Sequence, residues 1–389
     1  MYIRSFKVTK LNQQLSYNLI FNDDLNILTG RNGSGKTTLL KLMWCLISGN
    51  IELAIQEVDF ESAEVITDSF CLRIYFEANN KGKLERFIQF LPHASNSEDS
   101  EKIKLSKKTT HLPEQLIGRN LLEINQLVAS SMGKTIFFPT FRRVEGGFSV
   151  DPTSFPLDLS VKRRSIKHRR VDRIYASFNE LSERLSDENH RFVCSISTED
   201  IVRLITTKYA DASETINERY RELSGNIIKV IDDYKGSEDR DKHENSSQIL
   251  NEIQSNVSEV KSYQENTLKP FSVLSELVFD MFQHEGIKIS ESITLGNREN
   301  QVDSSQLSAG EKQMLSFLCY NSFVLGCPIF IDEPELSLHV DWQRLLFPTL
   351  LDQNTKNQFI VATHSPFIYS KYEDKEIILN PERGDTGGF

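Results

Sequence analysis

One short segment constrains the fold of this chain more than any other feature. Residues 30–38 have the sequence GRNGSGKTT, follow a short predicted strand at 24–29 (DLNILT) and precede the helical pattern Leu39–Trp44. Glycines at these positions let backbone N–H groups turn towards a phosphate, and the N-terminus of the following helix adds partial positive charge. The complete strand–loop–helix context favours a phosphate-binding loop over an ordinary glycine-rich turn. The residues expected to contact phosphate are Gly30, Arg31, Asn32, Gly33, Ser34, Gly35, Lys36, Thr37 and Thr38.

Four side chains in two motifs are suited to nucleotide chemistry. The Lys36 ammonium can bridge the β- and γ-phosphates, and the Thr37 hydroxyl can be a ligand of Mg²⁺. The acidic pair Asp332 and Glu333 follows the apolar run 328–331. Carboxylates at the end of a buried strand are costly unless a cation or a substrate uses them, although the strand could also simply end at the surface. With the loop present, we expect Asp332 on the Mg²⁺ side and Glu333 to orient and polarise the attacking water.

Two further segments are weak signals when taken alone. Residues 307–313 (LSAGEKQ) open an apolar helix that Ser308 can cap, and such a helix N-terminus can also face a phosphate. Residues 359–363 form another apolar strand, followed by a lone histidine, His364, which on general grounds is most often structural. If the first segment binds phosphate, the contacts come from Leu307, Ser308, Gly310 and Glu311.

Together, the four motifs GRNGSGKT, LSAGEKQ, IDEPELSLH and ATHSP resemble those of ABC-type ATPase heads. LSAGEKQ resembles the ABC signature, His364 matches the switch histidine, and residues 335–339 match the D-loop. The forms DEPELSLHVDWQ and THSP are similar to those of the SMC-like ATPases of the OLD-like group. That group is related to chromosome-maintenance ATPases and includes ATPase subunits of anti-phage systems such as Septu, PARIS, Gabija and retron-associated systems. The resemblance covers about 1–143 and 287–380.

The resemblance implies ATP and Mg²⁺ as cofactors, and a homodimer in which each ATP lies between one subunit's phosphate loop and the other's signature. Ser308 and Gly310 would then contact the γ-phosphate in trans, and His364 would join Lys36 and Glu333 as a catalytic residue. One segment departs from the family pattern. Family members often have a Gln on the Q-loop, whereas the equivalent segment here, 135–143 (TIFFPTFRR), has none. Its end resembles a proline–arginine variant found among the defence ATPases.

The expected fold is α/β: a P-loop ABC-type ATPase head with an antiparallel β subdomain and an inserted α-helical arm. Alternating segments at 3–8, 17–21, 71–77 and 84–90 predict the antiparallel sheet. Residues 95–106 are expected to form a polar loop, and 112–132 a helix. Three parts are predicted: the first part of the head (1–143, P-loop and β subdomain), a helical insertion with a basic segment (144–286), and the rest of the head (287–389, signature, Walker B and switch histidine).

The insertion contains a strong helical pattern. Apolar residues recur every three or four positions from Ile201 to Val230, with a mean spacing close to 3.6, the period of a straight amphipathic helix. A capping-box pattern at 197–200 precedes it. A return helix is expected from near Ser247, and Pro270 should break or re-aim it. About 30 helical residues extend roughly 45 Å, so we expect a short arm with a polar tip at 232–245.

A basic segment in the insertion is the strongest candidate for contact with a partner. Residues 162–170 contain six cations and no acid in nine positions. Three interpretations stay open: a solvated loop, a contact with nucleic-acid phosphate, and a contact with an acidic protein surface. The residues concerned are Lys162, Arg163, Arg164, Lys167, Arg169 and Arg170.

Composition restricts the possible partners and compartments. The 45 Lys and Arg residues are outnumbered by 55 Asp and Glu, giving a net charge of −10, so we expect no polyanion to cover the whole surface. Five scattered cysteines without a CxxC pair favour a reducing cytoplasm, and the first ten residues lack the apolar core of a signal peptide.

The uncharged run 314–331 is as long as a membrane span. Its polar and turn residues instead predict a buried helix to about Leu325, a turn at Gly326 and a strand, with no membrane contact.

Three functions remain as hypotheses. The favoured one is a dimeric ATP-driven switch or sensor of an anti-phage defence complex, controlling a separate effector such as a nuclease, because the chain has no second catalytic constellation. The alternative is a DNA-repair or chromosome-maintenance ATPase that binds DNA directly through the basic segment. A transporter ATPase subunit is disfavoured by the long insertion and by THSP in place of a transporter-like histidine loop.

Overall fold

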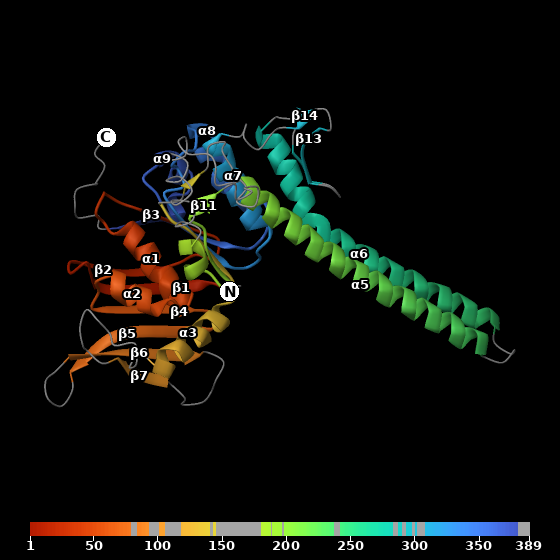
Figure 1. Cartoon of the computed structure of the whole chain (residues 1–389), viewed down its shortest axis with the longest axis horizontal. Helices are drawn as coiled ribbons and strands as arrows, with labels where there is room; N and C mark the ends of the chain where they lie inside the picture. The colour runs from red at the N-terminus through yellow and green to blue at the C-terminus, as the bar shows by residue number, and fades with distance from the viewer. Residues whose placement is uncertain are drawn as a thin grey trace, which may run out of the picture. The chain divides into compact units, whose positions relative to one another are not determined.

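The computed structural model divides the chain into two compact units (Figure 1). The first unit comprises Met1–Ile196, Ser308–Met314 and Val324–Phe389, and the second comprises Ser197–Leu307 and Leu315–Phe323. The residues that the structure describes are 1–78, 84–92, 101–105, 118–140, 143–144, 180–187, 189–196, 198–236, 242–282, 287–289, 293–297, 300–301 and 308–379. The predicted basic segment 162–170 and Leu307 lie outside these ranges.

A six-stranded parallel sheet forms one layer of the first unit. Its strands are ordered β10-β8-β15-β16-β3-β17. The four central strands, β8, β15, β16 and β3, are buried along their whole length, which explains why they are mostly apolar and do not alternate with exposed polar residues. The bounds of all six strands are β3 Leu25–Thr29, β8 Thr135–Phe138, β10 His190–Phe192, β15 Pro328–Asp332, β16 Gln358–Ala362 and β17 Glu376–Ile378.

A six-stranded antiparallel sheet forms a second layer, in the order β2-β1-β4-β5-β6-β7, as the alternating segments predicted. Its bounds are β1 Ile3–Leu11, β2 Leu15–Ile20, β4 Ser62–Thr67, β5 Phe70–Ala78, β6 Leu84–Pro92 and β7 Glu101–Leu105. The prediction of a loop over 95–106 is wrong for residues 101–105, which pair with β6. This segment has only five residues, and it carries the charges common on edge strands, so its polarity suggested a loop.

Helix α1 (Lys36–Ile47) lies between the two sheets and contacts β4 as well as β15 and β16. Nine of its twelve residues are buried, including Leu40, Trp44 and Ile47, because both sides of the helix pack against a sheet. Helices α2 (Ile51–Glu57) and α3 (Gly118–Met132) contact or pack close to α1, so one hydrophobic core joins the sheets and helices of this unit.

The C-terminal segments confirm the expected turn from helix to strand. Helix α7 (Ala309–Ser322) is followed by Gly326, whose φ of 60° lies in the left-handed region, and then by β15. Further elements are α8 (Val340–Asp352), α9 (Pro366–Tyr369) and the 3-10 turn η2 (Glu373–Lys375). Among the described residues, no helix has both the length and the apolar character needed to cross a bilayer.

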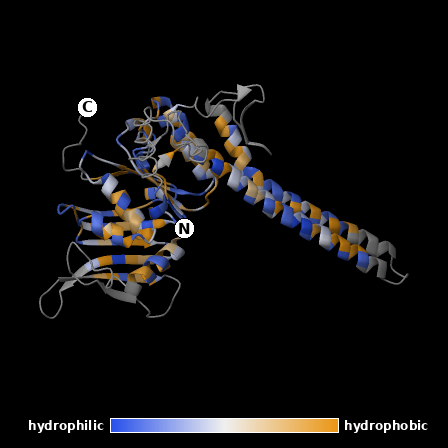
Figure 2. Ribbon diagram, in the orientation of Figure 1, coloured by the Kyte–Doolittle hydropathy of each residue, from blue (hydrophilic) through white to orange (hydrophobic). Residues whose placement is uncertain are grey.

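Two long helices, α5 (Thr198–Gly236) and α6 (Lys242–Phe282), form the arm and lie side by side (Figure 1). They have 39 and 41 residues, so each extends about 60 Å, more than the predicted length. Ile201, Ile205, Ile216 and Leu223 are buried, as the 3.6-residue period predicted. Figure 2 shows hydrophilic and hydrophobic residues mixed along both helices.

Helix α6 continues past Pro270 to Phe282, so the predicted break is wrong, but α6 bends along its course (Figure 1), which fits the re-aiming that was the other predicted outcome. The next residue, Phe271, packs edge-on against Tyr209 of α5 at 5.4 Å between ring centroids, and Leu274 and Val278 are also buried. This packing offsets the loss of one helical hydrogen bond at the proline.

The remaining strands are short. Strand β9 (Arg143–Val144) pairs with β11 (Ser195–Ile196), while β12 (Ile287–Ile289), β13 (Ile293–Asn297) and β14 (Asn300–Gln301) form a small sheet.

Candidate functional site

The predicted motifs meet at one edge of the parallel sheet. Four neighbouring strands, β8, β15, β16 and β3, run in the same direction, so the segments that follow them emerge at the same edge. These segments are residues 139–140, the acidic pair and D-loop, the histidine segment and the phosphate loop. The carboxyl edge of an open parallel sheet is where such folds bind ligands.

The phosphate loop has the backbone that its glycines predicted. Gly30, Gly33 and Gly35 have φ values of 135°, 84° and 80°, in the region that favours glycine. A Cβ at Gly30 would lie 2.7 Å from the carbonyl oxygen of Leu379, so glycine is required there for space as well. Arg31, Asn32, Gly33 and Thr37 are exposed, Gly35 and Thr38 are half-buried, and Ser34 and Lys36 are buried.

The Lys36 side chain folds back over its own loop. Its Nζ donates to the carbonyl oxygens of Gly30 at 2.7 Å and Arg31 at 3.2 Å. Burial lowers the pKa of Lys36, and the nearby carboxylates of Glu333, Asp332 and Glu335 partly oppose that shift. The ammonium is thus held at the loop by main-chain carbonyl oxygens and by the nearby carboxylates.

Asp332 lies at the centre of the site and is fully buried. The Thr37 hydroxyl donates to its Oδ1 at 3.2 Å, and the Thr140 hydroxyl donates to its Oδ2. The contact between Thr37 and Asp332 joins the phosphate loop to the end of β15, as the two motifs together predicted. Thr140 was not among the predicted site residues. Its segment, 135–143, was identified as the equivalent of the Q-loop, but a lone Thr after Pro139 has no distinctive spacing, and the pairing of β8 with β15 is what brings it to Asp332.

Glu333 has an unusual backbone. Its φ of 49° lies in the left-handed region, and its N–H donates to the carbonyl oxygen of Ala362 at the end of β16 at 2.8 Å. Burial raises the pKa of Glu333, and the negative charges of Asp332 and Glu335 raise it further, while His364 and Lys36 act in the opposite direction. A carboxylate with a raised pKa is a stronger base than an ordinary glutamate. His364 itself is exposed and near enough to influence this carboxylate.

The signature segment lies against the D-loop. Ser308 and Glu311 form a reciprocal capping box at the start of α7: the Ser308 N–H donates to Glu311 Oε2 at 2.6 Å, and the Glu311 N–H donates to Ser308 Oγ at 3.3 Å. A Cβ at Gly310 would lie 2.5 Å from the carbonyl oxygen of Ser337, so a side chain there would displace the D-loop. Gln313 Nε2 donates to the carbonyl oxygen of Pro334 at 2.8 Å. The expected helix cap at Ser308 is therefore confirmed.

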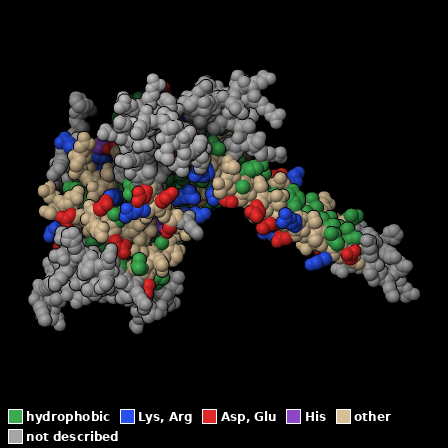
Figure 3. Space-filling model, viewed as in Figure 1, with side chains coloured by type: hydrophobic (Ala, Val, Ile, Leu, Met, Phe, Trp, Pro, Cys, Tyr) green, Lys and Arg blue, Asp and Glu red, His purple; other side chains and the backbone are tan. Residues whose placement is uncertain are grey.

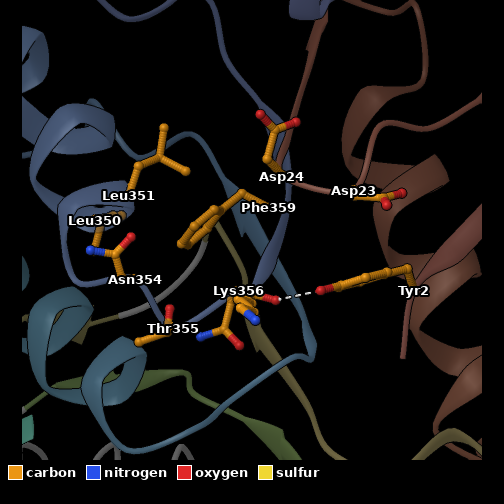
Figure 4. A pocket seen from close by; sticks show the side chains of 10 residues that line it. Tyr2, Asp23, Asp24, Leu350, Leu351, Asn354, Thr355, Lys356 and Phe359 are labelled. Carbon is orange, nitrogen blue, oxygen red and sulfur yellow. Dashed lines mark hydrogen bonds between the residues drawn. The ribbon is translucent and has the colours of Figure 1, made fainter.

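A hollow of about 280 Å³ lies at the opposite edge of the parallel sheet, where β3 and β16 begin (Figure 4). The Tyr2 hydroxyl donates to the carbonyl oxygen of Lys356 at 3.0 Å, as Figure 4 shows, and Asp24 forms an ion pair with Lys375 at 2.9 Å. None of the predicted site residues lines this hollow, so we do not assign the site to it.

Comparison with known proteins gives one family and a set of distant structures. The AAA ATPase domain family matches residues 1–369 of the chain. Two similar structures are an Smc head domain with an extended coiled coil from Pyrococcus furiosus, bound to the C-terminal domain of ScpA, and an SmcHead bound to the C-winged helix domain of ScpA. Their sequence identities are 13% and 11%, their TM-scores are 0.36 and 0.38, and each alignment covers 95% of this chain and 91% of the other. The search of curated proteins gives no significant match.

Proposed function

The chain belongs to the family of AAA ATPase domains, and from this premise we propose that it is a dimeric, ATP-driven switch. As a member of that family it binds and hydrolyses ATP. The observation that supports the assignment of this activity to particular residues is the buried carboxylate of Asp332, which accepts a hydroxyl from the phosphate loop and another from Thr140. A buried carboxylate held this way is suited to a ligand that brings positive charge.

We assign the triphosphate to the phosphate loop. Backbone N–H groups from Gly30 to Thr38 and the N-terminus of α1 would face the phosphate oxygens, and Lys36 would exchange its main-chain acceptors for the β- and γ-phosphates. This exchange is reasonable because a phosphate oxygen is a stronger acceptor for an ammonium than a neutral carbonyl oxygen.

The residues present also fit Mg²⁺. Thr37 and Asp332 offer a hydroxyl and a carboxylate, hard oxygen donors of the kind that this cation prefers, and these groups already lie within 3.2 Å of each other. Thr37 and Asp332 would hold the ion, and Thr140 would support the carboxylate from its other oxygen. When bound, Mg²⁺ would neutralise charge on the phosphates.

Glu333 is the proposed general base. Its raised pKa makes it a better proton acceptor, and the backbone contact with Ala362 fixes its position beside β16. His364, which influences the same carboxylate, is the proposed switch that responds to the γ-phosphate. Leu307, Ser308, Gly310 and Glu311 are proposed to complete the ATP site of a second copy in trans, with the capping hydroxyl of Ser308 and the first amides of α7 turned to the phosphate.

The setting proposed for this switch is a cytoplasmic anti-phage defence complex in which ATP controls a separate effector such as a nuclease. It is supported by the forms DEPELSLHVDWQ and THSP. The free state of all five cysteines fits a reducing compartment. The ATP-dependent dimer is the part of this proposal that can be tested with the purified chain alone.

The test compares Glu333→Gln with Lys36→Ala. Removal of a general base should lower kcat by about 10²–10⁴-fold, while ATP binding persists and the ATP-bound dimer accumulates. Lys36→Ala should abolish ATP binding and dimer formation. Phosphate release, nucleotide affinity and light scattering with and without ATP measure these outcomes. Glu61→Gln is the matched control, because Glu61, the residue before β4, pairs with Lys10 of β1 at 3.0 Å, and it should behave as the unaltered protein. An unchanged kcat in Glu333→Gln would refute the assignment.

The alternative function, a DNA-repair or chromosome-maintenance ATPase, depends on the basic segment 162–170. Neutralising Arg163, Arg164, Arg169 and Arg170 should then abolish DNA binding and DNA-stimulated ATPase activity, and the affinity should fall steeply with salt. DNA binding that survives this change would show that the segment is not the contact. If the chain has no affinity for DNA, the effector hypothesis is favoured.

A further inference from the structure

Glu335 bridges the two segments that carry the proposed catalytic side chains. It follows Glu333 by two positions, and its carboxylate accepts two hydrogen bonds from the segment after β16. The backbone N–H of His364 donates to Oε1 at 2.7 Å, and the Thr363 hydroxyl donates to Oε2 at 2.8 Å. One carboxylate therefore holds the main chain at His364 and the side chain of its neighbour.

The partners of this bridge are themselves fixed. Thr363 is fully buried, its N–H donates to the carbonyl oxygen of Leu28 in β3, and its hydroxyl oxygen accepts from the N–H of Ser365 at 3.0 Å. On the side of Glu335, the N–H of Leu338 donates to the Glu335 carbonyl oxygen at 3.0 Å. Both ends of the bridge are thus tied to main chain that follows a buried strand.

A second connection runs beside the first. The Ser365 hydroxyl donates to Gln343 Oε1 at 2.6 Å, and Gln343 Nε2 donates to the carbonyl oxygen of Leu338 at 2.9 Å. The segment around His364 is therefore held to the D-loop by Glu335 on one side and by Gln343 of α8 on the other. The side chain of His364 stays exposed while its backbone is held.

We propose that Glu335 is a positioning residue for ATP hydrolysis: its carboxylate fixes the backbone of His364 relative to Glu333, so that histidine and base keep one geometry. This inference rests on the proposed function, because it acts through the roles given there to Glu333 and His364. Glu335 itself is assigned no contact with nucleotide. Its role in this proposal is to hold His364 and Thr363 by hydrogen bonds; the effect of its charge on the pKa of Glu333 is the smaller contribution.

This distinction can be tested because an amide can replace the acceptor without the charge. In Glu335→Gln, the amide oxygen can still accept from His364 N–H, and the amide nitrogen can donate to the Thr363 hydroxyl oxygen, so both contacts can form although the second is reversed and the Thr363 proton loses this acceptor. Glu335→Ala removes both connections and leaves the N–H of His364 without this acceptor. If the carboxylate instead acted by its charge, both variants would lose activity alike.

The experiment measures kcat and KM for ATP, nucleotide affinity and thermal unfolding for Glu335→Gln, Glu335→Ala, His364→Ala and the double variant Glu335→Ala/His364→Ala. We expect Glu335→Gln to retain kcat within about threefold. Glu335→Ala should lose about 10²-fold in kcat with little change in KM, because a displacement of about 1 Å at a catalytic group has effects of this size. The double variant should be no slower than His364→Ala, since one residue acts through the other.

Thr363 provides a second route if Glu335→Ala fails to fold. Thr363→Ser keeps the hydroxyl and should keep kcat, whereas Thr363→Val removes the bond to Glu335, together with the one from Ser365 N–H, but leaves the bond from His364 N–H to Glu335, so it should give a smaller loss than Glu335→Ala. Equal losses in Glu335→Gln and Glu335→Ala, or additive losses in the double variant, would overturn the proposal. So would a normal kcat in Glu335→Ala. These failures differ from failure of the proposed function, which would appear as unchanged turnover in Glu333→Gln.

Discussion

The two six-stranded sheets of the first unit differ in the burial of their strands and in the part that each contributes to the site. In the parallel sheet, β3, β15 and β16 are buried at every position, whereas in the antiparallel sheet β4 alternates between buried and half-buried residues. A strand buried on both faces has few positions for a polar side chain, so the functional residues of β15 lie at its end: Asp332 is its last residue and Glu333 follows it. The antiparallel sheet contributes support instead: the Tyr17 hydroxyl donates to the carbonyl oxygen of Ser34 in the phosphate loop at 2.7 Å.

The arm provides a further contrast. Its helices carry ion pairs on the surface, such as Arg219 with Glu222 at 3.2 Å, and Figure 3 shows cationic, anionic and hydrophobic side chains together along the face in view. Exposed pairs of this kind contribute little to stability, typically below about 1 kcal/mol. Sensitivity to substitution should therefore be greatest in the parallel sheet, and the following predictions test that ranking.

The largest effect on stability is expected from two adjacent residues of β15, Ile329 and Phe330. They are 1% and 0% exposed although they point to opposite faces of the sheet. Ile329→Ala should cost about 2–5 kcal/mol of unfolding free energy, and Phe330→Ala about 3–5 kcal/mol, because both leave cavities. Urea unfolding followed by tryptophan fluorescence measures this, since both tryptophans, Trp44 and Trp342, lie in the first unit. A negligible loss at either position would contradict two-sided burial.

A smaller effect is expected at the edge of the same sheet, where His190 of β10 is buried. Its Nε2 donates to the carbonyl oxygen of Ala129 at 3.0 Å, and its Nδ1 lies 2.8 Å from the Thr135 hydroxyl, so the neutral ring satisfies both contacts by accepting from Thr135. Burial lowers the pKa of His190. The unfolded chain therefore binds a proton first, and stability is lost as the pH falls from about 6.5 to the folded-state pKa, by up to about 1.4 kcal/mol per pH unit.

Urea midpoints between pH 7.5 and pH 5 test this prediction. His190→Gln, which cannot be protonated, should be less stable at neutral pH, but its unfolding free energy should no longer fall with pH through the titration of residue 190. His364→Ala is the matched control, since His364 is exposed and the slope should persist there. A slope of equal size in His190→Gln would assign the pH dependence to other groups.

The smallest effect is expected on the open face of the antiparallel sheet. Leu19 and Ile20 are neighbours on β2, but Leu19 is 6% exposed and Ile20 is 78% exposed. Ile20→Ala should change the unfolding free energy by less than about 0.5 kcal/mol. Leu19→Ala should cost about 2–5 kcal/mol, because it empties part of the core. The same urea experiment measures both, and similar losses at the two positions would show that β2 is packed on both faces, which would remove its contrast with the strands of the parallel sheet.

Local sequence predicted the motifs, because residue type and spacing alone identify Gly30 to Thr38, the acidic pair after β15 and the Ser308 cap. The 3.6-residue period likewise predicted the buried face of α5. Strand β4 was not predicted, although Ala63, Val65 and Thr67 alternate with half-buried residues, because the run is short and contains Ser and Glu.

Contacts between distant segments could not be predicted in the same way. Thr140 reaches Asp332 only because β8 pairs with β15, and Glu335 reaches His364 only because β15 pairs with β16. Neither side chain has a spacing that indicates its partner, since the register of the parallel sheet decides which strand ends are adjacent. The continuation of α6 past Pro270 has a related reason: the packing of Phe271 against Tyr209 outweighs the local rule that a proline ends a helix.

Glu333 has a consequence for engineering. Its left-handed backbone costs on the order of 1 kcal/mol for a residue with a Cβ, and its surroundings disfavour its charge, so it opposes folding in two ways. Asn or Gly adopts that backbone more readily. Directed evolution for heat resistance, without a demand for turnover, should therefore replace Glu333 and yield a more durable protein that no longer hydrolyses ATP. Screens for robust variants of this chain must select for activity at the same time.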